Sequence, residues 1–89
     1  MTNLKDLLKK LEIAEDTANR ADTAYENDPE NAELEKAFDE AYKAEWIAFE
    51  NVVSAICEIT DGKIDIKTAR TMIKTKRNEL LTIAERATQ

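Results

Sequence analysis

The stretch EITDGKIDIKTA, residues 58–69, gathers acidic side chains around the only glycine of the chain, a composition that could bind calcium. An EF-hand loop needs oxygen ligands at its first, third and twelfth positions and a glycine at the sixth. Aligning Gly62 with that glycine places Cys57, Ile59 and Thr68 at the ligand positions. The aspartates and the bidentate glutamate are therefore missing. The pattern predicts no calcium site and favours a helix C-cap at Gly62 followed by a bend.

The inventory of residues offers little for catalysis. The chain has no histidine, which is the commonest general base near neutral pH and the commonest zinc ligand. Cys57 is the only cysteine, so it lacks both a disulfide partner and an activating histidine. Acidic pairs at helical spacing, such as Glu12 with Asp16, are expected by chance among 19 acids. We therefore expect a protein that is not an enzyme and holds no metal or cofactor.

Basic residues recur at helical spacing in the last third of the chain, where phosphates could contact them. The candidate interaction residues of this stripe are Lys67, Arg70, Lys74 and Arg77. Residues 62–89 hold seven basic and three acidic side chains, whereas the rest of the chain carries a net charge of -10. No aromatic residue interleaves the stripe for base stacking. Weak nucleic-acid binding is the second alternative function.

Residues 28–61 have the opposite character, with ten acidic and only two basic side chains. A helix of this composition presents an anionic ridge, which normally serves solubility. Such a ridge can also compete for the basic clefts of nucleic-acid enzymes. The first alternative function is therefore an acidic inhibitor or nucleic-acid mimic directed at a nucleic-acid enzyme. A phage protein of this kind is one form of that alternative.

Apolar residues at alternating steps of three and four predict an all-α fold in a single domain, residues 1–89. Asn3 suits the N-cap of a first helix and Asp65 that of a third, while Asp28 and Pro29 suit the start of a second. The predicted helices span about 4–26, 29–59 and 66–87. Short connections between them predict an up-down-up antiparallel bundle around a long central helix. A helical hairpin that completes its core by dimerising fits the same pattern.

The predicted central helix carries two apolar lines. The narrow line consists of Leu34, Ala37, Ala41, Ala44, Ala48, Val52, Ala55 and Ile59. The wide line consists of Phe38, Tyr42, Trp46, Phe49, Val53 and Ile56. We expect the narrow line to face the first helix, whose seam ends in alanines, and the wide line to be covered by the third helix.

Two charged residues fall on surfaces that should be buried, Glu45 in the central helix and Lys76 in the third. In an antiparallel bundle they lie about one helical turn apart, so we expect a partly buried ion pair. The competing interpretation is that the long Lys76 stem carries its charge out to solvent.

Two apolar residues, Ile13 and Ile47, fall on the polar sides of their helices, where they should be exposed. Antiparallel packing places them at similar heights along the bundle axis. The sequence therefore predicts a self-association patch that contains both.

Neither a membrane-spanning run nor a secretory signal is visible, so we expect a cytoplasmic protein. The acidic and almost glycine-free composition resembles that of many small bacterial or phage accessory proteins. The function we expect is a noncatalytic interaction or regulatory module that self-associates and docks another protein through a helix face.

Overall fold

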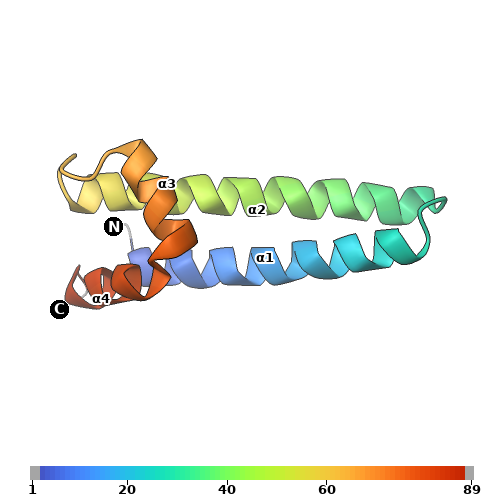
Figure 1. Ribbon diagram of the computed structural model, residues 1–89, viewed down its shortest axis with the longest axis horizontal. Helices are drawn as coiled ribbons and strands as arrows, with labels where there is room; N and C mark the ends of the chain where they lie inside the picture. The colour runs from blue at the N-terminus through green and yellow to red at the C-terminus, as the bar shows by residue number, and fades with distance from the viewer. Residues whose placement is uncertain (1–2, 88–89) are drawn as a thin grey trace.

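The computed structural model describes the backbone of residues 3–87 and the side chains of residues 3–83. Within that range the chain is all-α, as predicted, and no strand is present. The helices are α1 (Leu4–Asn27), α2 (Ala32–Ile59), α3 (Ile66–Thr75) and α4 (Arg77–Ala87). Figure 1 shows α1 and α2 as a long antiparallel hairpin, with α3 crossing one end of it toward α4. We call that end the base and the opposite end, where α1 connects to α2, the tip.

Side-chain caps define both ends of the hairpin. The Asn3 carboxamide oxygen accepts the Asp6 backbone N–H at 3.3 Å, which confirms the predicted cap of α1. At the tip, Asn31 caps α2 by accepting the backbone N–H of Glu33 at 3.0 Å. The expected cap, Asp28, lies in the connection instead, where its carboxylate accepts the Asn31 side-chain amide at 3.3 Å. The central helix therefore begins at Ala32, and the Asn31 carboxamide oxygen caps it by accepting the Glu33 and Leu34 N–H groups.

The bend at residues 60–65 contains the helix C-cap that the sequence predicted. Gly62 has the positive φ of 79° that the sequence predicted, and its N–H donates to the Cys57 carbonyl at 2.9 Å. The Thr60 hydroxyl oxygen accepts the Ile64 N–H at 3.3 Å, and Ile64 packs against the core. Asp65 caps α3 by accepting the Thr68 N–H at 2.7 Å, and the hydrogen bonds from Thr68 lower the pKa of Asp65.

The predicted third helix is wrong in one respect, because it breaks at Lys76, whose φ and ψ are -133° and 43°. The hydroxyls of Thr71 and Thr75 donate to backbone carbonyls four residues earlier, a bond that bends helices. The Arg77 Nε donates to the Ile73 carbonyl at 3.2 Å. This bond gives a partner to one of the carbonyls at the C-terminal end of α3. As a result α3 packs on α2, while α4 turns back to pack on α1.

The break concentrates the core at the base. The buried residues there come from all four helices: Leu4, Leu8, Leu11, Val52, Val53, Ala55, Ile56, Ala69, Ile73 and Leu80. Among the described residues nearer the tip, only Ala18 and Ala41 are buried. Alanines let α1 and α2 approach closely but enclose little apolar surface. The protein is thus an elongated body of 47 × 23 × 23 Å with a well-packed base and a thin tip.

The wide apolar line of α2 divides at the edge of this base. Val53 and Ile56 are buried, as predicted. Tyr42 and Trp46 are 57% and 55% exposed, which contradicts the expectation that the third helix covers the whole line. A third segment folded into two short helices reaches only the base, so Tyr42 and Trp46 face solvent, while Phe38 and Phe49 are half-buried.

Leu80 should be essential for anchoring α4, because its side chain is fully buried in the core at the base. We expect Leu80→Ala to lower the free energy of unfolding by about 2 to 5 kcal/mol, measured by urea denaturation followed by circular dichroism. Its neighbour Leu81 is 40% exposed, so Leu81→Ala is the matched control and should have a much smaller effect. Equal losses for the two variants would mean that α4 is not docked as described.

Candidate functional site

All aromatic side chains of the chain lie in one row, which we call the aromatic face. Its members are Tyr25, Phe38, Tyr42, Trp46 and Phe49. The four on α2 recur at steps of four, four and three, which keeps them on one side of that helix. Tyr25, from the last turn of α1, stacks on Phe38 with a ring-centroid distance of 5.9 Å, and Phe38 stacks on Tyr42 at 6.2 Å. Trp46 stacks on Phe49 at 6.2 Å. The stacking contacts thus join the rings in two groups, one around Phe38 and one of Trp46 with Phe49.

The aromatic face continues around α2 to Ile47, which is 60% exposed. Tyr42, Lys43, Trp46 and Ile47 line one surface depression whose walls are mostly apolar. Single exposed apolar residues are common, but a contiguous exposed cluster of this kind marks a site of interaction on most soluble proteins. The aromatic face is therefore the leading candidate site of this protein.

A groove of about 370 Å³ lies where the aromatic face meets α3 and α4. Its lining residues are Glu15, Tyr42, Glu45, Trp46, Phe49, Lys74 and Arg77. The Lys74 ammonium lies 5.9 Å from the centroid of the Phe49 ring, within range of a cation–π interaction. Four helices thus place aromatic rings, two carboxylates and two cations around one opening.

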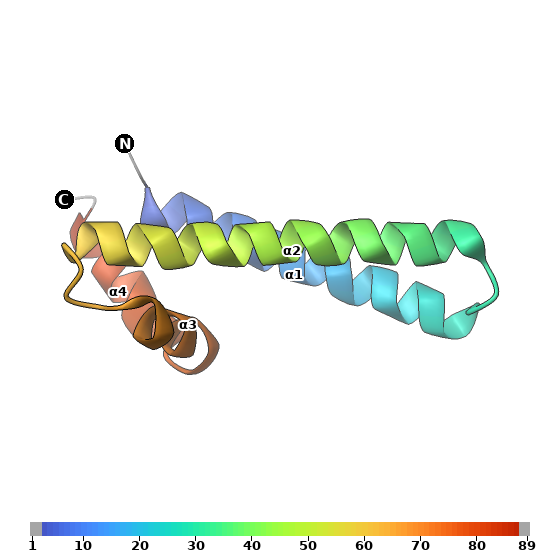
Figure 2. The same ribbon diagram turned by 90° about the horizontal axis from the view of Figure 1, so that it is seen from above.

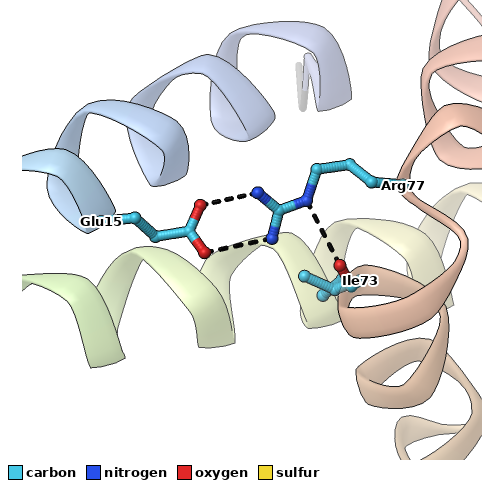
Figure 3. Close-up of polar contacts among 3 residues, drawn as sticks. All are labelled: Glu15, Ile73 and Arg77. Atoms are coloured by element: carbon cyan, nitrogen blue, oxygen red, sulfur yellow. Dashed lines mark hydrogen bonds and ion pairs between the residues drawn. The ribbon is translucent and has the colours of Figure 1, made fainter.

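The charged wall of the groove is organised by an ion pair between α1 and the first residue of α4 (Figure 3). Arg77 Nη1 and Nη2 donate to the two carboxylate oxygens of Glu15 at 2.6 and 3.2 Å. Arg77 also donates to the Ile73 carbonyl, so its guanidinium joins α1, α3 and α4. The hydrogen bond with Glu15 raises the pKa of Arg77, which keeps the guanidinium charged. Bidentate pairs of this type fix orientation as well as charge.

Glu45 lies in the same groove without such a partner. Partial burial raises the pKa of Glu45, and repulsion from the Glu15 carboxylate raises it further. The expected pair between Glu45 and Lys76 is not among the ion pairs of the described residues. Lys76 is exposed at the helix break, and the next residue, Arg77, pairs with Glu15.

The sequence contained a weak signal for the role of Glu15. The seam of α1 that faces α2 includes the buried Leu4, Leu8, Leu11 and Ala18. Glu15 completes the steps of four, three, four and three along this line, so a charged residue occupies a seam position. Leu7 and Ala14, each one residue earlier than Leu8 and Glu15, give an apolar line with similar spacing, which makes the charged seam position hard to recognise from the sequence.

The two isoleucines predicted to form one patch are both exposed but line separate depressions. Ile13 is 59% exposed and lies among polar residues of α1, including Lys9, Glu12 and Asp16. Ile47 instead borders the aromatic face. The structure thus extends the candidate surface around Ile47 and leaves Ile13 outside it.

Most residues of the predicted basic stripe are occupied within the molecule. Arg70 donates to a Glu50 carboxylate oxygen at 3.0 Å, Arg77 pairs with Glu15, and Lys74 lies over Phe49. Lys67 is exposed near the start of α3. Because these contacts neutralise or engage the cations, the stripe offers phosphates less than the sequence indicated.

Cys57 is free and half-buried. In the part of the chain that the structure describes, no three potential ligands among His, Cys, Asp and Glu come together. None of the described helices has the combination of length and apolar character that crossing a membrane requires. The chemistry that the described site supports is binding of apolar and aromatic surface beside a charged wall.

The ion pair between Glu15 and Arg77 should be energetically coupled, because the two groups form a bidentate contact between distant segments. A double-mutant cycle with Glu15→Gln and Arg77→Gln, measured by urea denaturation, should give a coupling free energy of about 1 kcal/mol. The same cycle with Glu45→Gln and Lys76→Gln should be additive. Additivity of the Glu15 and Arg77 substitutions, together with coupling between Glu45 and Lys76, would support the pair that the sequence predicted.

The raised pKa of Glu45 means that ionisation of this carboxyl opposes folding, since the folded state holds its proton more tightly than the unfolded chain does. The penalty is present above the raised pKa and is relieved as the pH falls through it toward the ordinary value of 4.5. We expect Glu45→Gln to increase the free energy of unfolding at about pH 7 by less than about 1 kcal/mol, with the gain lost near pH 4. Glu40→Gln, at an exposed acid of the same helix, is the control. An equal gain from both substitutions would show a general charge effect and contradict the role of the groove.

Comparison of the chain with protein-family models, curated proteins and solved structures gives no match.

Proposed function

We propose that this protein is a noncatalytic helical module that works by binding another protein chain through its aromatic face. The observation that carries the proposal is the exposure of Tyr42 and Trp46, at 57% and 55%, within a stacked aromatic row. Tyrosine and tryptophan are the residues most enriched at the energetic centres of protein interfaces. Burying them would remove a large apolar area from water at about 25 cal/mol per Å².

The aromatic face is also suited to binding because it is preorganised. Its rings are held by stacking along one straight helix, and Lys74 fixes Phe49 at the edge nearest the base. A partner would therefore lose little affinity to the ordering of flexible side chains. The charged wall of Glu15 and Arg77 beside the rings provides a polar rim that can set orientation.

The first alternative, an acidic inhibitor or nucleic-acid mimic, is supported by the many acids near the tip of the hairpin. We rank it second because a charge mimic needs no exposed tryptophan. Direct nucleic-acid binding by α3 ranks third, since Arg70 and Arg77 are already paired with Glu50 and Glu15. A cytoplasmic location is part of the proposal, and the unpaired Cys57 suits the reducing conditions there.

A photo-crosslinking amino acid at position 46, introduced in the cell of origin, tests the proposal. We expect covalent adducts with a second protein chain, because Trp46 lies at the centre of the exposed row. Position 51 is the matched control, since Asn51 is exposed on the same helix but about 140° away around its axis. Absence of adducts at position 46, or equal adducts at both positions, would contradict the proposed function.

A further inference from the structure

We infer that the chain bound by the aromatic face is a second copy of this protein, packed antiparallel so that the α3–α4 unit of each copy covers the aromatic face of the other. This inference rests on the proposed function, because it names the occupant of the same surface. It follows from the shape of the protein, from its separated charges and from apolar residues that are exposed on α3 and α4.

The shape includes a recess beside the middle of α2. Figure 2 shows α3 and α4 projecting from one side of α2 at the base and α1 swinging to the same side at the tip, with the middle of α2 open between them. The α3 helix packs on α2 and reaches Phe49 through Lys74, and the other α2 members of the aromatic face lie closer to the tip than Phe49 does. A two-fold rotation about an axis across the hairpin places the projection of each copy in the open region of the other. The contact is then the same on both copies and closes on itself, as in most homodimers.

The charges favour this antiparallel arrangement. Residues 16–45, which form the tip half of the hairpin, include ten acidic and three basic side chains. Residues 63–83, which form the bend, α3 and most of α4, include six basic and two acidic side chains. Antiparallel packing brings the basic unit of each copy onto the acidic half of the other, so the attraction occurs twice. Parallel packing would place like charges together and is disfavoured.

Several charges that this contact needs are exposed and form no ion pair in the single chain, although Lys67 acts electrostatically on Asp65. Lys63, Lys67 and Lys76 are exposed and take part in none of the ion pairs between described residues. The same is true of acids near the tip, namely Glu26, Glu30, Glu33 and Glu35. The base already shows how such a contact works, because Lys74 of α3 lies over the Phe49 ring of α2. Lysines of a second copy would make the same kind of contact with the exposed rings nearer the tip.

The α3–α4 unit also supplies an apolar counterpart. Ile66 and Leu81 are 56% and 40% exposed, although they flank the well-packed core at the base. Placed on Tyr42 and Trp46 of a second copy, they would add apolar layers over the part of the hairpin where only Ala18 and Ala41 are buried. The result is a helical core along the full length of both hairpins, which is the arrangement that stabilises antiparallel helix bundles.

Sedimentation analysis of the purified full chain tests the inference. We expect a mass of twice the 10.1 kDa chain. Trp46→Ala and Ile66→Asp change exposed residues of opposite halves of the contact, and each should raise the dissociation constant at least about tenfold. Ile13→Asp is the matched control, because Ile13 is equally exposed but outside the contact, and it should leave the mass unchanged. Circular dichroism of every variant checks that helix content is retained.

A charge exchange tests the antiparallel placement itself. Lys67→Glu with Lys76→Glu makes the α3–α4 unit repel an acidic tip, and Glu30→Lys with Glu33→Lys makes the tip repel a basic unit. Each double variant alone should be monomeric at concentrations where the unaltered protein is a dimer. An equimolar mixture should restore the dimer, because each interface then again joins opposite charges. Failure of the mixture to dimerise would overturn the placement of α3–α4 on the partner's tip.

The other outcomes separate the inference from the function on which it rests. A 10.1 kDa particle at high concentration, together with cellular adducts at position 46 to a different protein, would overturn the second copy but support the interaction module. A dimer that Trp46→Ala and Ile66→Asp both leave intact would place self-association on another surface and overturn the inference. A monomer without adducts at position 46 would overturn both proposals.

Discussion

The break at Lys76 is the constraint on which the rest of the structure depends. A continuous helix over residues 66–87 would be about 33 Å long and would cover most of the aromatic line of α2. The chain instead divides that length between α3, which packs on α2, and α4, which returns to α1. This division builds a four-helix core at the base and leaves the aromatic face toward the tip without a covering element. The packing of the base and the exposure of Trp46 are therefore two consequences of one bend.

Polar contacts that only the folded chain can make hold this bend in place. Arg77 accommodates the bend by satisfying the Ile73 carbonyl and by binding Glu15 across the groove. Glu15 occupies a seam position where an uncompensated carboxylate would be unfavourable, so the guanidinium also relieves a defect of α1. Glu45, which lacks a comparable cation, shows the alternative outcome as a raised pKa. At the edge of the aromatic face the groove thus holds one carboxylate that is paired with a cation, Glu15, and one whose pKa is raised, Glu45.

The sequence predicted those features that depend on local signals. The Asn3 and Asp65 caps and the positive φ of Gly62 follow from residue type and position, and the structure contains each of them. The break at Lys76 is marked by neither proline nor glycine; there the Thr71 and Thr75 hydroxyls bond back to the preceding turn, and Arg77 pairs with Glu15. The pairing expected for Glu45 and Lys76 assumed an unbroken helix. The periodicity of the sequence revealed the aromatic line of α2. It could not predict how much of that line α3 covers, because this depends on how the helices pack together.

An exposed aromatic row on a small protein would normally favour nonspecific association. The charge pattern of this chain gives a physical reason to expect specific association instead. The net charge of -6 repels copies that approach in arbitrary orientations. The separation of that charge into an acidic tip half and a basic α3–α4 unit makes one antiparallel orientation attractive while its alternatives remain repulsive. Specificity of this kind requires repulsion from wrong arrangements as well as attraction in the right one. In the proposed dimer, the uneven charge along the chain and the open aromatic face act together: apolar area would supply affinity, and charge would select the geometry.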